Sequence, residues 1–516
     1  MEIDLAQLDS SVTGSDLLRA PMCIIGGGIA GLTLAHRLIS LGHEVMLFEA
    51  GGHALEAFEE IQQAGHPHPG TSEPRPCALG GTSLTWGGQL LPFPQDSTAW
   101  PISSADLALF TTEAEQLLAV DPLPYDATEF FTEVRQPAPS LLNQLSQLDA
   151  SLSKFAPFSH RNLAHTLGPK LRAHSNARII LNTQVTELLL APLGDHIEAV
   201  LICTSSGRTH RIEAGQFILA AGTIETIRLL LASRSVVPEG IGNQHDQVGR
   251  NFHDHLTVTA ATLREPSRTH LLEALRPWAY RSTLHSLKLA ASPELRHQLN
   301  LTPILAHLTI DEPDTSGIGA LRNLLRARQQ NNLAVTLRKT LPQLPGALAD
   351  AARLTLSAHT QHRRYVSPQA TVQLRLNAAQ RAPSASRITL SPELQPILDW
   401  RIDPTELATL RTFTQYLRTR LDLDGIDWNP ALLTADISTP IPNLDDARHA
   451  MGGACMGIDP HTSVVGPDLR VHGLRNLFIA SAAVFPDGSP QLPTLPLMAL
   501  TLRLAQHLHQ QQKANR

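Results

Sequence analysis

The sequence has little cysteine, little charge and no long apolar run. Its four cysteines, among 516 residues, are widely spaced and form no Cys-x-x-Cys pair, so neither a disulfide framework nor a metal site is indicated. Charged residues make up 17% of the chain, compared with about 25% in typical globular proteins. The net charge is −6, and only five of the 41 basic residues are lysines, which argues against a nucleic-acid partner.

Targeting and membrane-spanning signals are also missing. No apolar run reaches about 18 residues, the length that suggests a membrane span. Residues 1–20 carry acidic side chains where a secretory signal peptide needs basic ones. We therefore expect a soluble, cytoplasmic protein with no membrane segment. Because one hydrophobic core stops growing at roughly 250–300 residues, we also expect more than one domain.

Near the N-terminus, two apolar runs enclose a glycine-rich turn and an amphipathic segment. Residues 22–25 have strand character, residues 29–41 place apolar side chains at helical spacing, and a second strand over 44–48 ends at Glu49. The turn between the first strand and the helix fits Gly-x-Gly-x-x-Gly through Gly26, Gly28 and Gly31. This order of strand, turn, helix, strand and acid is the fingerprint of a βαβ dinucleotide-binding unit.

Each part of that fingerprint has a physical task. Gly26 allows the tight turn, Gly28 lets the backbone approach a pyrophosphate, and Gly31 lets the helix pack close to the strand. The helix N-terminus favours phosphate groups, and Glu49 would accept hydrogen bonds from a ribose. The fingerprint does not decide between FAD and NAD. It predicts a nucleotide site that also includes Ile29, Ala30 and Ala50.

A second glycine-rich segment, CALGGTSLTWGGQLLPFP, covers residues 77–94. Paired glycines on either side of small hydroxyl residues suit a backbone that lies against a flat ligand or a pyrophosphate. A glycine-rich turn around a buried tryptophan explains the same residues equally well. From its chemistry alone the segment leaves both interpretations open.

LGGTSLTWGGQ resembles the loop that contacts the isoalloxazine ring in the glucose–methanol–choline (GMC) flavoprotein oxidoreductases, and is similar to the branch of bacterial sugar dehydrogenases and pyranose oxidase-like enzymes. The resemblance implies FAD. Some relatives attach FAD through a histidine of this loop, but the matching position here is Thr85, which implies non-covalent FAD. By the same resemblance the loop's cofactor-binding residues are Gly81, Thr82, Thr85, Trp86, Gly87 and Gly88.

The middle of the chain returns to the nucleotide site. A strand over 208–221 runs into AGTIETIRLLLAS, which resembles the second GMC signature and implies cofactor contacts at Ala221 and Gly222. Residues 176–190 read as a strand in which Val185 matches the position that meets the adenine. The alternation over 370–378 predicts antiparallel strands. His253, Asp254 and His255 have the composition of a metal cluster, but we favour a structural turn and expect no metal.

Residues 446–508 resemble the GMC C-terminal signature. His449, in HAMGGACMG, matches the catalytic histidine of the family, and an imidazole can take the hydroxyl proton while hydride leaves for flavin N5. The resemblance also implies flavin contacts at Ala482 and Thr494. The family places an asparagine or a second histidine where this chain has Leu492. Leucine cannot hydrogen-bond an alkoxide, so either Gln491 reaches the substrate or His449 has a different helper.

The GMC resemblance implies an α/β FAD-binding Rossmann-like domain interleaved with an α+β substrate domain built on an antiparallel sheet. We expect the FAD-binding domain over 20–100, 165–256 and 440–516, and the substrate domain over 101–164 and 257–439. The implied function is oxidation of a CH–OH group, in a sugar or another alcohol, with an unidentified electron acceptor. A non-redox lyase or decarboxylase of the same fold, or a silent flavin-binding protein, remains an alternative.

Overall fold

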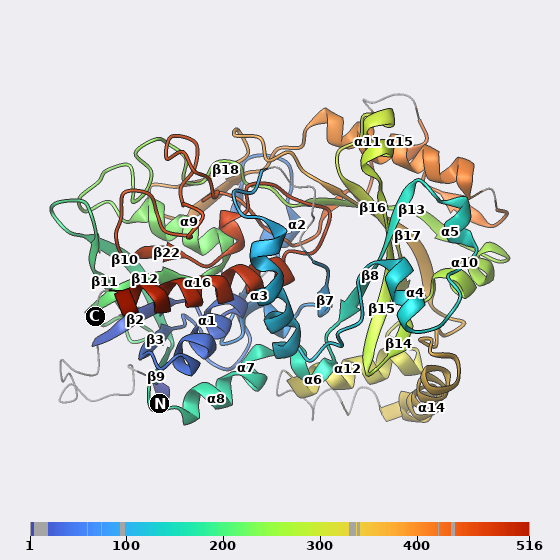
Figure 1. The fold of residues 1–516 in the computed structure, drawn as a ribbon, viewed down its shortest axis with the longest axis horizontal. Coiled ribbons are helices and arrows are strands. Elements are labelled where there is room, and N and C mark those ends of the chain that lie inside the picture. Colours follow the sequence, from blue (N-terminus) through green and yellow to red (C-terminus); the bar gives the residue numbers. More distant parts are fainter. Residues whose placement is uncertain are drawn as a thin grey trace.

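The computed structural model describes residues 2–4, 19–58, 60–73, 75–92, 99–329, 337, 341–421, 423–434 and 439–514. The strands form two large sheets that lie toward opposite ends of the molecule (Figure 1). Two small sheets accompany them. One pairs β4 (Glu56–Phe58) with β6 (Arg75–Cys77), and the other joins β5 (Gln62–Gln63), β18 (Arg387–Leu390) and β19 (Pro396–Asp399).

The first large sheet is the core of the nucleotide-binding fold. Within the described residues it has eight strands in the order β1-β9-β3-β2-β12-β11-β10, with β22 beside β12. All pairings from β1 to β12 and β22 are parallel, and β11 and β10 are antiparallel. The strands are β1 (Glu2–Asp4), β2 (Arg19–Ile25), β3 (Val45–Phe48), β9 (Ala177–Leu181), β10 (Thr183–Leu190), β11 (Ile197–Thr204), β12 (Thr209–Leu219) and β22 (Leu477–Ile479).

The second large sheet is antiparallel. Its nine strands, counted in the described part of the chain, follow the order β20-β13-β17-β16-β15-β8-β7, with β14 on β15 and β21 on β13. Alternate residues of β17 are buried, as in a sheet with two different faces. The strands are β7 (Gln89–Leu90), β8 (Leu148–Phe155), β13 (His255–Leu263), β14 (Trp278–Tyr280), β15 (Thr283–Ala291), β16 (Ile304–Asp311), β17 (Thr371–Ala379), β20 (Ile426–Trp428) and β21 (Asp445–Asp446).

Helices cover both sheets. α1 (Ile29–Ser40), α3 (Ser104–Leu117) and α16 (Thr494–Ala514) pack together beside the first sheet, and α9 (Gly222–Ala232) contacts β10 and β18. α4 (Ala127–Glu133) packs on β8, and α15 (Pro404–Arg420) packs on β16 and β17. The remaining helices include α2 (Pro69–Ser72), α5 (Leu141–Gln144), α6 (Phe158–Arg161), α7 (Leu163–Thr166), α8 (Gly168–Ala173), α10 (Ser267–Leu275), α11 (Pro293–Leu299), α12 (Gly317–Gln329) and α14 (Leu344–Gln361).

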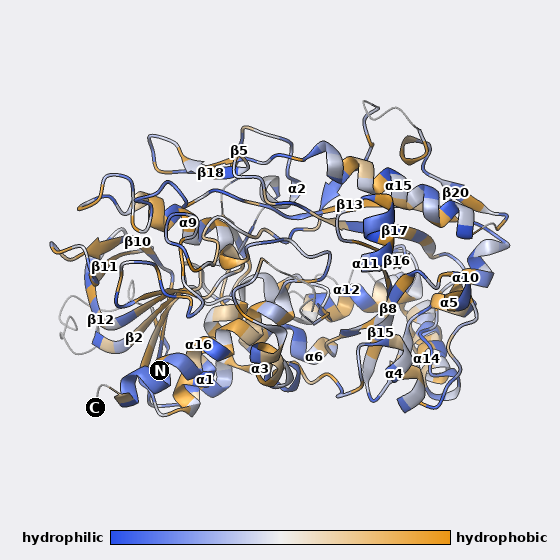
Figure 2. Ribbon diagram, turned by 45° about the horizontal axis from the view of Figure 1, so that its top comes forward, coloured by the Kyte–Doolittle hydropathy of each residue, from blue (hydrophilic) through white to orange (hydrophobic). Residues whose placement is uncertain are grey.

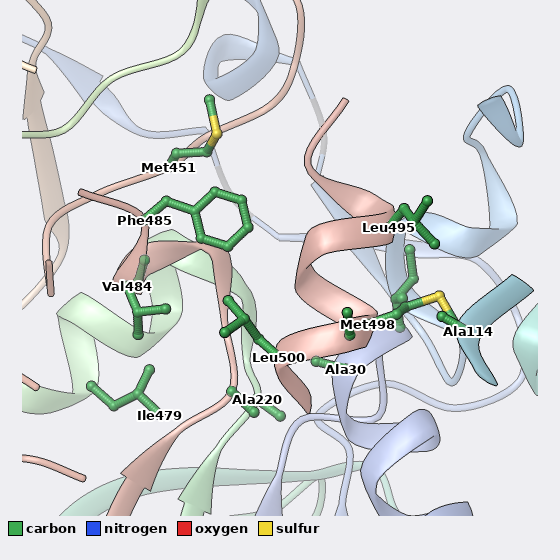
Figure 3. Close-up of a cluster of buried hydrophobic side chains, with 14 of the residues drawn as sticks. Ala30, Ala114, Ala220, Met451, Ile479, Val484, Phe485, Leu495, Met498 and Leu500 are labelled. Atoms are coloured by element: carbon green, nitrogen blue, oxygen red, sulfur yellow. The ribbon is translucent and has the colours of Figure 1, made fainter. Parts of the chain in front are cut away.

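The hydrophobic core joins the N-terminal and C-terminal parts of the chain. Hydrophobic colour runs along the strands around β2 and β12, and alternates with hydrophilic colour along α1 and α16 (Figure 2). Leu495 and Met498 of α16 lie in one buried cluster with Ala30 of α1 and Ala114 of α3 (Figure 3). Among the described helices, none combines the length and apolar character needed to cross a membrane.

Most of the expected elements are present, with one clear difference. The strands expected over 22–25, 44–48 and 370–378 correspond to β2, β3 and β17, and the helix expected over 29–41 is α1. The single strand expected over 176–190 is wrong, because Asn182 adopts φ 51° and divides the segment into β9 and β10. A side chain that tolerates the left-handed region can end a strand inside a continuous apolar pattern.

The strands confirm an interleaved fold. Those of the first sheet come from 2–48, 177–219 and 477–479, and those of the second come from 89–90, 148–155, 255–311, 371–379 and 426–446. β7 pairs with β8 of the second sheet although it lies inside the range expected for the FAD-binding domain. The exact domain boundaries remain a prediction.

Candidate active site

A cavity of about 810 Å³ opens along the carboxyl ends of the first sheet and reaches the C-terminal segment. Ligands of open α/β sheets bind at this edge. Its walls contain most of the residues expected from the sequence to contact the cofactor: Gly26, Gly28, Ile29, Ala30, Glu49, Ala50, Gly81, Thr82, Thr85, Trp86, Gly87, Val185, Ala221, Gly222, Ala482 and Thr494. His449 and Leu492 also line the cavity.

The three glycines of the N-terminal turn differ in what a side chain at their position would contact. Gly26 adopts φ 108°, and a Cβ there would lie 2.5 Å from the Ala220 carbonyl oxygen. A Cβ on Gly31 would collide with the Gly26 carbonyl, so Gly31 serves helix packing and does not line the cavity. A Cβ on Gly28, the N-cap residue of α1, would meet nothing closer than the Gly81 Cα at 4.0 Å.

No protein contact therefore requires glycine at position 28. Its φ of −79° is one that any residue adopts. A glycine facing open cavity at the start of a twelve-residue helix fits a phosphate group that must approach the backbone closely. The cavity and this turn together fit the pyrophosphate of a dinucleotide.

Glu49, directly after the second strand of the βαβ unit, accepts a hydrogen bond from the backbone of the same turn. It is buried, and its carboxylate accepts hydrogen bonds from the backbone N–H groups of Gly27 at 2.8 Å and Gly51 at 3.0 Å. Burial raises the pKa of Glu49, and these hydrogen bonds oppose that rise. The carboxylate thus holds the turn and borders the cavity, where its remaining lone pairs can accept ribose hydroxyls.

The second glycine-rich segment forms another part of the wall. Residues 81–84 make a short 3₁₀ turn, and the Trp86 indole donates to the Arg161 carbonyl at 2.9 Å. Gly88 does not line the cavity. A Cβ there would meet the Arg161 Nε at 2.5 Å, and its carbonyl accepts from Ala156 at 2.7 Å. Trp86 is half-buried, is anchored by this hydrogen bond and borders the cavity, so the structure is consistent with both interpretations and a contact of this segment with the cofactor stays a prediction.

His449 lies half-buried in the cavity wall opposite these glycines, within the C-terminal segment. Its Nδ1 is 3.1 Å from Nδ1 of His255, the first residue of β13, and the two rings meet edge to face. Among the described residues, Nε2 of His449 has no protein hydrogen-bond partner. Burial lowers the pKa of His449, and Asp254 partly offsets this effect. A neutral imidazole with one free nitrogen can accept a proton.

His255 stays neutral beside it. Burial, and then the charge of His449, lower the pKa of His255 to about 3. The pair shares one hydrogen bond between two Nδ1 atoms, so one ring donates and the other accepts. If His449 donates, its Nε2 carries no proton and is the basic nitrogen. This second histidine comes from β13 and not from the segment around Leu492.

Asp254 fixes the backbone on both sides of this histidine pair. Its carboxylate accepts from the backbone N–H groups of His255 at 2.6 Å, Ala447 at 3.1 Å and His449 at 2.7 Å. Asp254 is completely buried. Burial raises its pKa, but the contact with His68 and the charges of the two other histidines bring the pKa below its usual value. The carboxylate therefore positions the segment that carries His449.

His68 lies between two carboxylates beneath the pair. Its Nε2 is 3.3 Å from Asp254 Oδ2 and its Nδ1 is 3.4 Å from Asp446 Oδ2, and all three side chains are buried. Burial lowers the pKa of His68, but Asp254 and then Asp446 raise it above its usual value. A ring that faces carboxylates with both nitrogens is best satisfied as a cation. Neither His68 nor Asp446 was expected from the sequence, because no local motif links residues so far apart.

The three residues His253, Asp254 and His255, which we expect to form a structural turn, have separate contacts in the structure. The Nδ1 of His253 contacts the Asn251 carbonyl at 2.7 Å, so this ring belongs to its own turn. Asp254 and His255 instead come together with His449, and Asp254 also comes together with His68 and Asp446. The ligand atoms of each trio lie close enough to hold a metal ion. The three backbone N–H groups bound by Asp254 show that its carboxylate already has a structural task.

The structure distinguishes the two alternatives for the missing polar group, which are Gln491 and a different helper of His449. Leu492 lines the cavity, whereas Gln491 does not, and the Gln491 side chain accepts a hydrogen bond from Ser489 at 3.0 Å. The expectation that Gln491 reaches the reacting group has no support in this placement. His255, which contacts His449 directly, takes the position of the alternative helper.

Comparison with known proteins agrees with this site. Two family models, both described as GMC oxidoreductase, match residues 162–257 and 382–501, and an NAD(P)-binding Rossmann-like domain model matches 24–69. The chain belongs to the GMC oxidoreductase family. Its nucleotide is accordingly FAD, and the glycine turn, Glu49, Val185 and Thr494 are among the residues that would hold it.

Among its relatives, the chain is similar to the fructose dehydrogenase large subunit of Gluconobacter japonicus, with 26% identity over 64% of this chain and 53% of that subunit. The match therefore spans about half of the relative's length. The 6'''-hydroxyparomomycin C oxidase of Streptomyces lividus is 22% identical over 94% of this chain and 91% of the relative. The fold matches pyridoxine 4-oxidase from Mesorbium loti with a TM-score of 0.60, 16% identity and coverage of 95% and 99% of the two chains.

Proposed function

We propose that this chain oxidises the CH–OH group of a sugar, glycoside or related alcohol, with FAD as cofactor and His449 as general base. One observation carries the proposal: His449 borders the cofactor cavity with its Nδ1 engaged by His255, which leaves Nε2 as the nitrogen that can take a hydroxyl proton. The sugar- and alcohol-oxidising names among the relatives support the same reaction class.

FAD, when bound, supplies the acceptor for the hydride that leaves the carbinol carbon. The protein's own residues orient the alcohol and move its proton. His449 takes the proton at Nε2, and the neutral His255 keeps the ring oriented through the hydrogen bond between the Nδ1 atoms. Asp254 holds the His449 backbone, and its negative charge stabilises the imidazolium that forms.

We also propose that the FAD is held without a covalent bond. The loop residue at the position that carries the attaching histidine in some relatives is Thr85, which lines the cavity but offers no nitrogen for such a bond. Holoenzyme denatured in acid should release all of its flavin into the supernatant. Flavin that stays with the precipitated protein would contradict this part of the proposal.

Anaerobic mixing of the holoenzyme with a panel of sugars and alcohols tests the reaction class. We expect at least one compound to bleach the oxidised flavin absorbance. Leu492 gives a reason to include hydroxynitriles and fatty acids, because an apolar side chain in the cavity wall suits a non-redox reaction as well. Turnover of one of those compounds, with no bleaching by any alcohol, would replace the proposal with a lyase or decarboxylase activity.

A further inference from the structure

The second large sheet has one polar face that borders the proposed active site. The strand register places the following side chains on it, here called the inner face: Ser151 and Ser153 of β8, Ser286 and Lys288 of β15, His307 of β16, Gln373, Arg375 and Asn377 of β17, and His255, Thr257 and Thr259 of β13. On β17 the residues between these are buried and belong to the opposite, apolar face, against which α15 packs.

Two side-chain contacts connect the inner face with the proposed active site. At one end His255 touches His449. At the opposite edge of the sheet, Gln89 donates from Nε2 to the Ser153 hydroxyl at 2.7 Å, and Gln89 lines the cofactor cavity. The strands between β13 and β8 are β17, β16 and β15. Their inner-face side chains therefore lie between two points that both touch the site.

Three basic side chains stand next to one another in that interval. His307 pairs directly with Arg375 in the adjacent strand, and the register of β15 with β16, in which Leu289 pairs with Ala306, places Lys288 opposite His307. Directly opposed residues have Cβ atoms about 5 Å apart. Lys288, His307 and Arg375 thus form a row across three neighbouring strands, here called the basic row.

No acidic side chain compensates this row within the described part of the chain. Lys288 is 3% exposed, and its ammonium group has no hydrogen bond or ion pair there; burial alone lowers its pKa to about 7. Burial, and then the charges of Lys288 and Arg375, lower the pKa of His307, whose buried Nδ1 has no partner. The carboxylates on the same face, Asp149 and Asp311, are exposed and lie near strand ends.

Such an arrangement costs stability when its groups are charged, because adjacent like charges on a sheet repel and an unpaired buried ammonium loses its hydration. A bound anion would favour the charged forms of all three groups. It is also unexpected in a chain whose net charge is −6 and which has only five lysines. Anions bound by a protein are normally held by such convergent cations. We propose that the substrate carries a carboxylate or phosphate group and that Lys288, His307 and Arg375 bind this anion while the reacting CH–OH group lies at His449.

This inference rests on the proposed alcohol oxidation and names the substrate class. It is tested with four matched compounds: glucose, gluconate, glucose 6-phosphate and glucosamine, each mixed anaerobically with the holoenzyme. We expect gluconate or glucose 6-phosphate to reduce the flavin with a kcat/KM at least tenfold above that of glucose. Glucosamine should be the poorest. Equal values for the anionic and neutral sugars, or a preference for glucosamine, would overturn the inference.

Variants of the row give the residue-level test. Lys288→Met keeps the length of the side chain, removes the charge and leaves an apolar group in a buried position; Arg375→Gln is the second variant. Each should lower kcat/KM for the anionic sugar by about 30-fold, mainly through KM, and should lower the value for glucose far less. The control is Lys170→Met, which removes an exposed lysine of α8. An unchanged ratio of anionic to neutral substrate in both row variants would contradict the assignment.

Equilibrium binding separates the inference from the proposed function. Inorganic phosphate is titrated into the oxidised holoenzyme and binding is followed by calorimetry. We expect binding to the wild type, and at least tenfold weaker binding to Lys288→Met. If phosphate binds in this way but no alcohol bleaches the flavin, the anion site stands and the proposed reaction fails. If sugars bleach the flavin but phosphate binds equally to both proteins or to neither, the reaction stands and the anion site is wrong.

Discussion

The glycine turn that opens the cofactor cavity and the histidine–carboxylate cluster at its other end are built in opposite ways. The turn uses backbone groups within residues 26–31 and one acid from the next strand. The cluster uses side chains of His68, Asp254, His255, Asp446 and His449, which come from three distant parts of the chain. A backbone site can be specified by a short stretch of sequence, whereas a side-chain cluster exists only after the whole chain has folded.

The largest effect is expected at the proton acceptor. His449→Ala should slow flavin reduction by the best substrate by roughly 10²–10⁴-fold, the usual contribution of a general base. FAD content should not change, because the glycine turn lies in another part of the wall. Anaerobic stopped-flow absorbance measures the rate.

His461→Ala is the matched control for that variant, since His461 is an exposed histidine of the same C-terminal segment. It should react like the wild type. A His449→Ala enzyme that reduces its flavin at the wild-type rate would remove this residue from the mechanism.

Asp254→Asn should damage both stability and chemistry. It removes one of the two carboxylates that His68 faces and replaces an acceptor of three backbone N–H groups, so the free energy of unfolding should fall by about 3–5 kcal/mol. Urea denaturation measures this loss, and flavin reduction by the folded variant should be slower. Asp311→Asn, at an exposed strand end, is the control. Equal stability of the two variants would show that Asp254 does not hold the segment.

Two alanine substitutions in the glycine turn should separate packing from cofactor binding. Gly31→Ala places a methyl group against the Gly26 carbonyl and should destabilise the apoprotein by about 1–3 kcal/mol. Gly28→Ala faces open cavity and should leave the apoprotein stable while weakening FAD binding by roughly tenfold, or about 1.4 kcal/mol. Thermal unfolding of the apoproteins and fluorescence titration with FAD provide the measurements. Weaker FAD binding in neither variant would mean that the turn does not contact the cofactor.

The smallest effect concerns pH. Burial keeps the pKa of His449 below its usual 6.5, so the basic, neutral form is present throughout the neutral range. The rate of flavin reduction should therefore be constant from neutral pH down to about 6.5 and should fall only below it, as Nε2 becomes protonated. Stopped-flow traces across this range provide the profile. A rate that still rises between pH 7 and 8 would indicate a base with a higher pKa.

These contrasts explain how far the sequence could be interpreted. The βαβ unit, the cavity loop and His449 lie in short motifs and stand where those motifs implied. Gly31 serves helix packing, as the fingerprint implies, whereas Gly88 was expected to contact the cofactor and does not line the cavity. His255 was visible only as part of a suspected metal cluster, because its contact with His449 spans 194 positions. His68, Asp446 and the basic row depend on strand register and on buried titratable groups, which no local pattern contains.

The proposed function requires a two-electron oxidation of an alcohol by bound FAD. The most direct measurement is the stoichiometry of one anaerobic turnover with the fastest-reacting alcohol of the panel. The proposed reaction should form one carbonyl product for each flavin that is bleached. Product formed without bleaching, or bleaching without a carbonyl product, would contradict it.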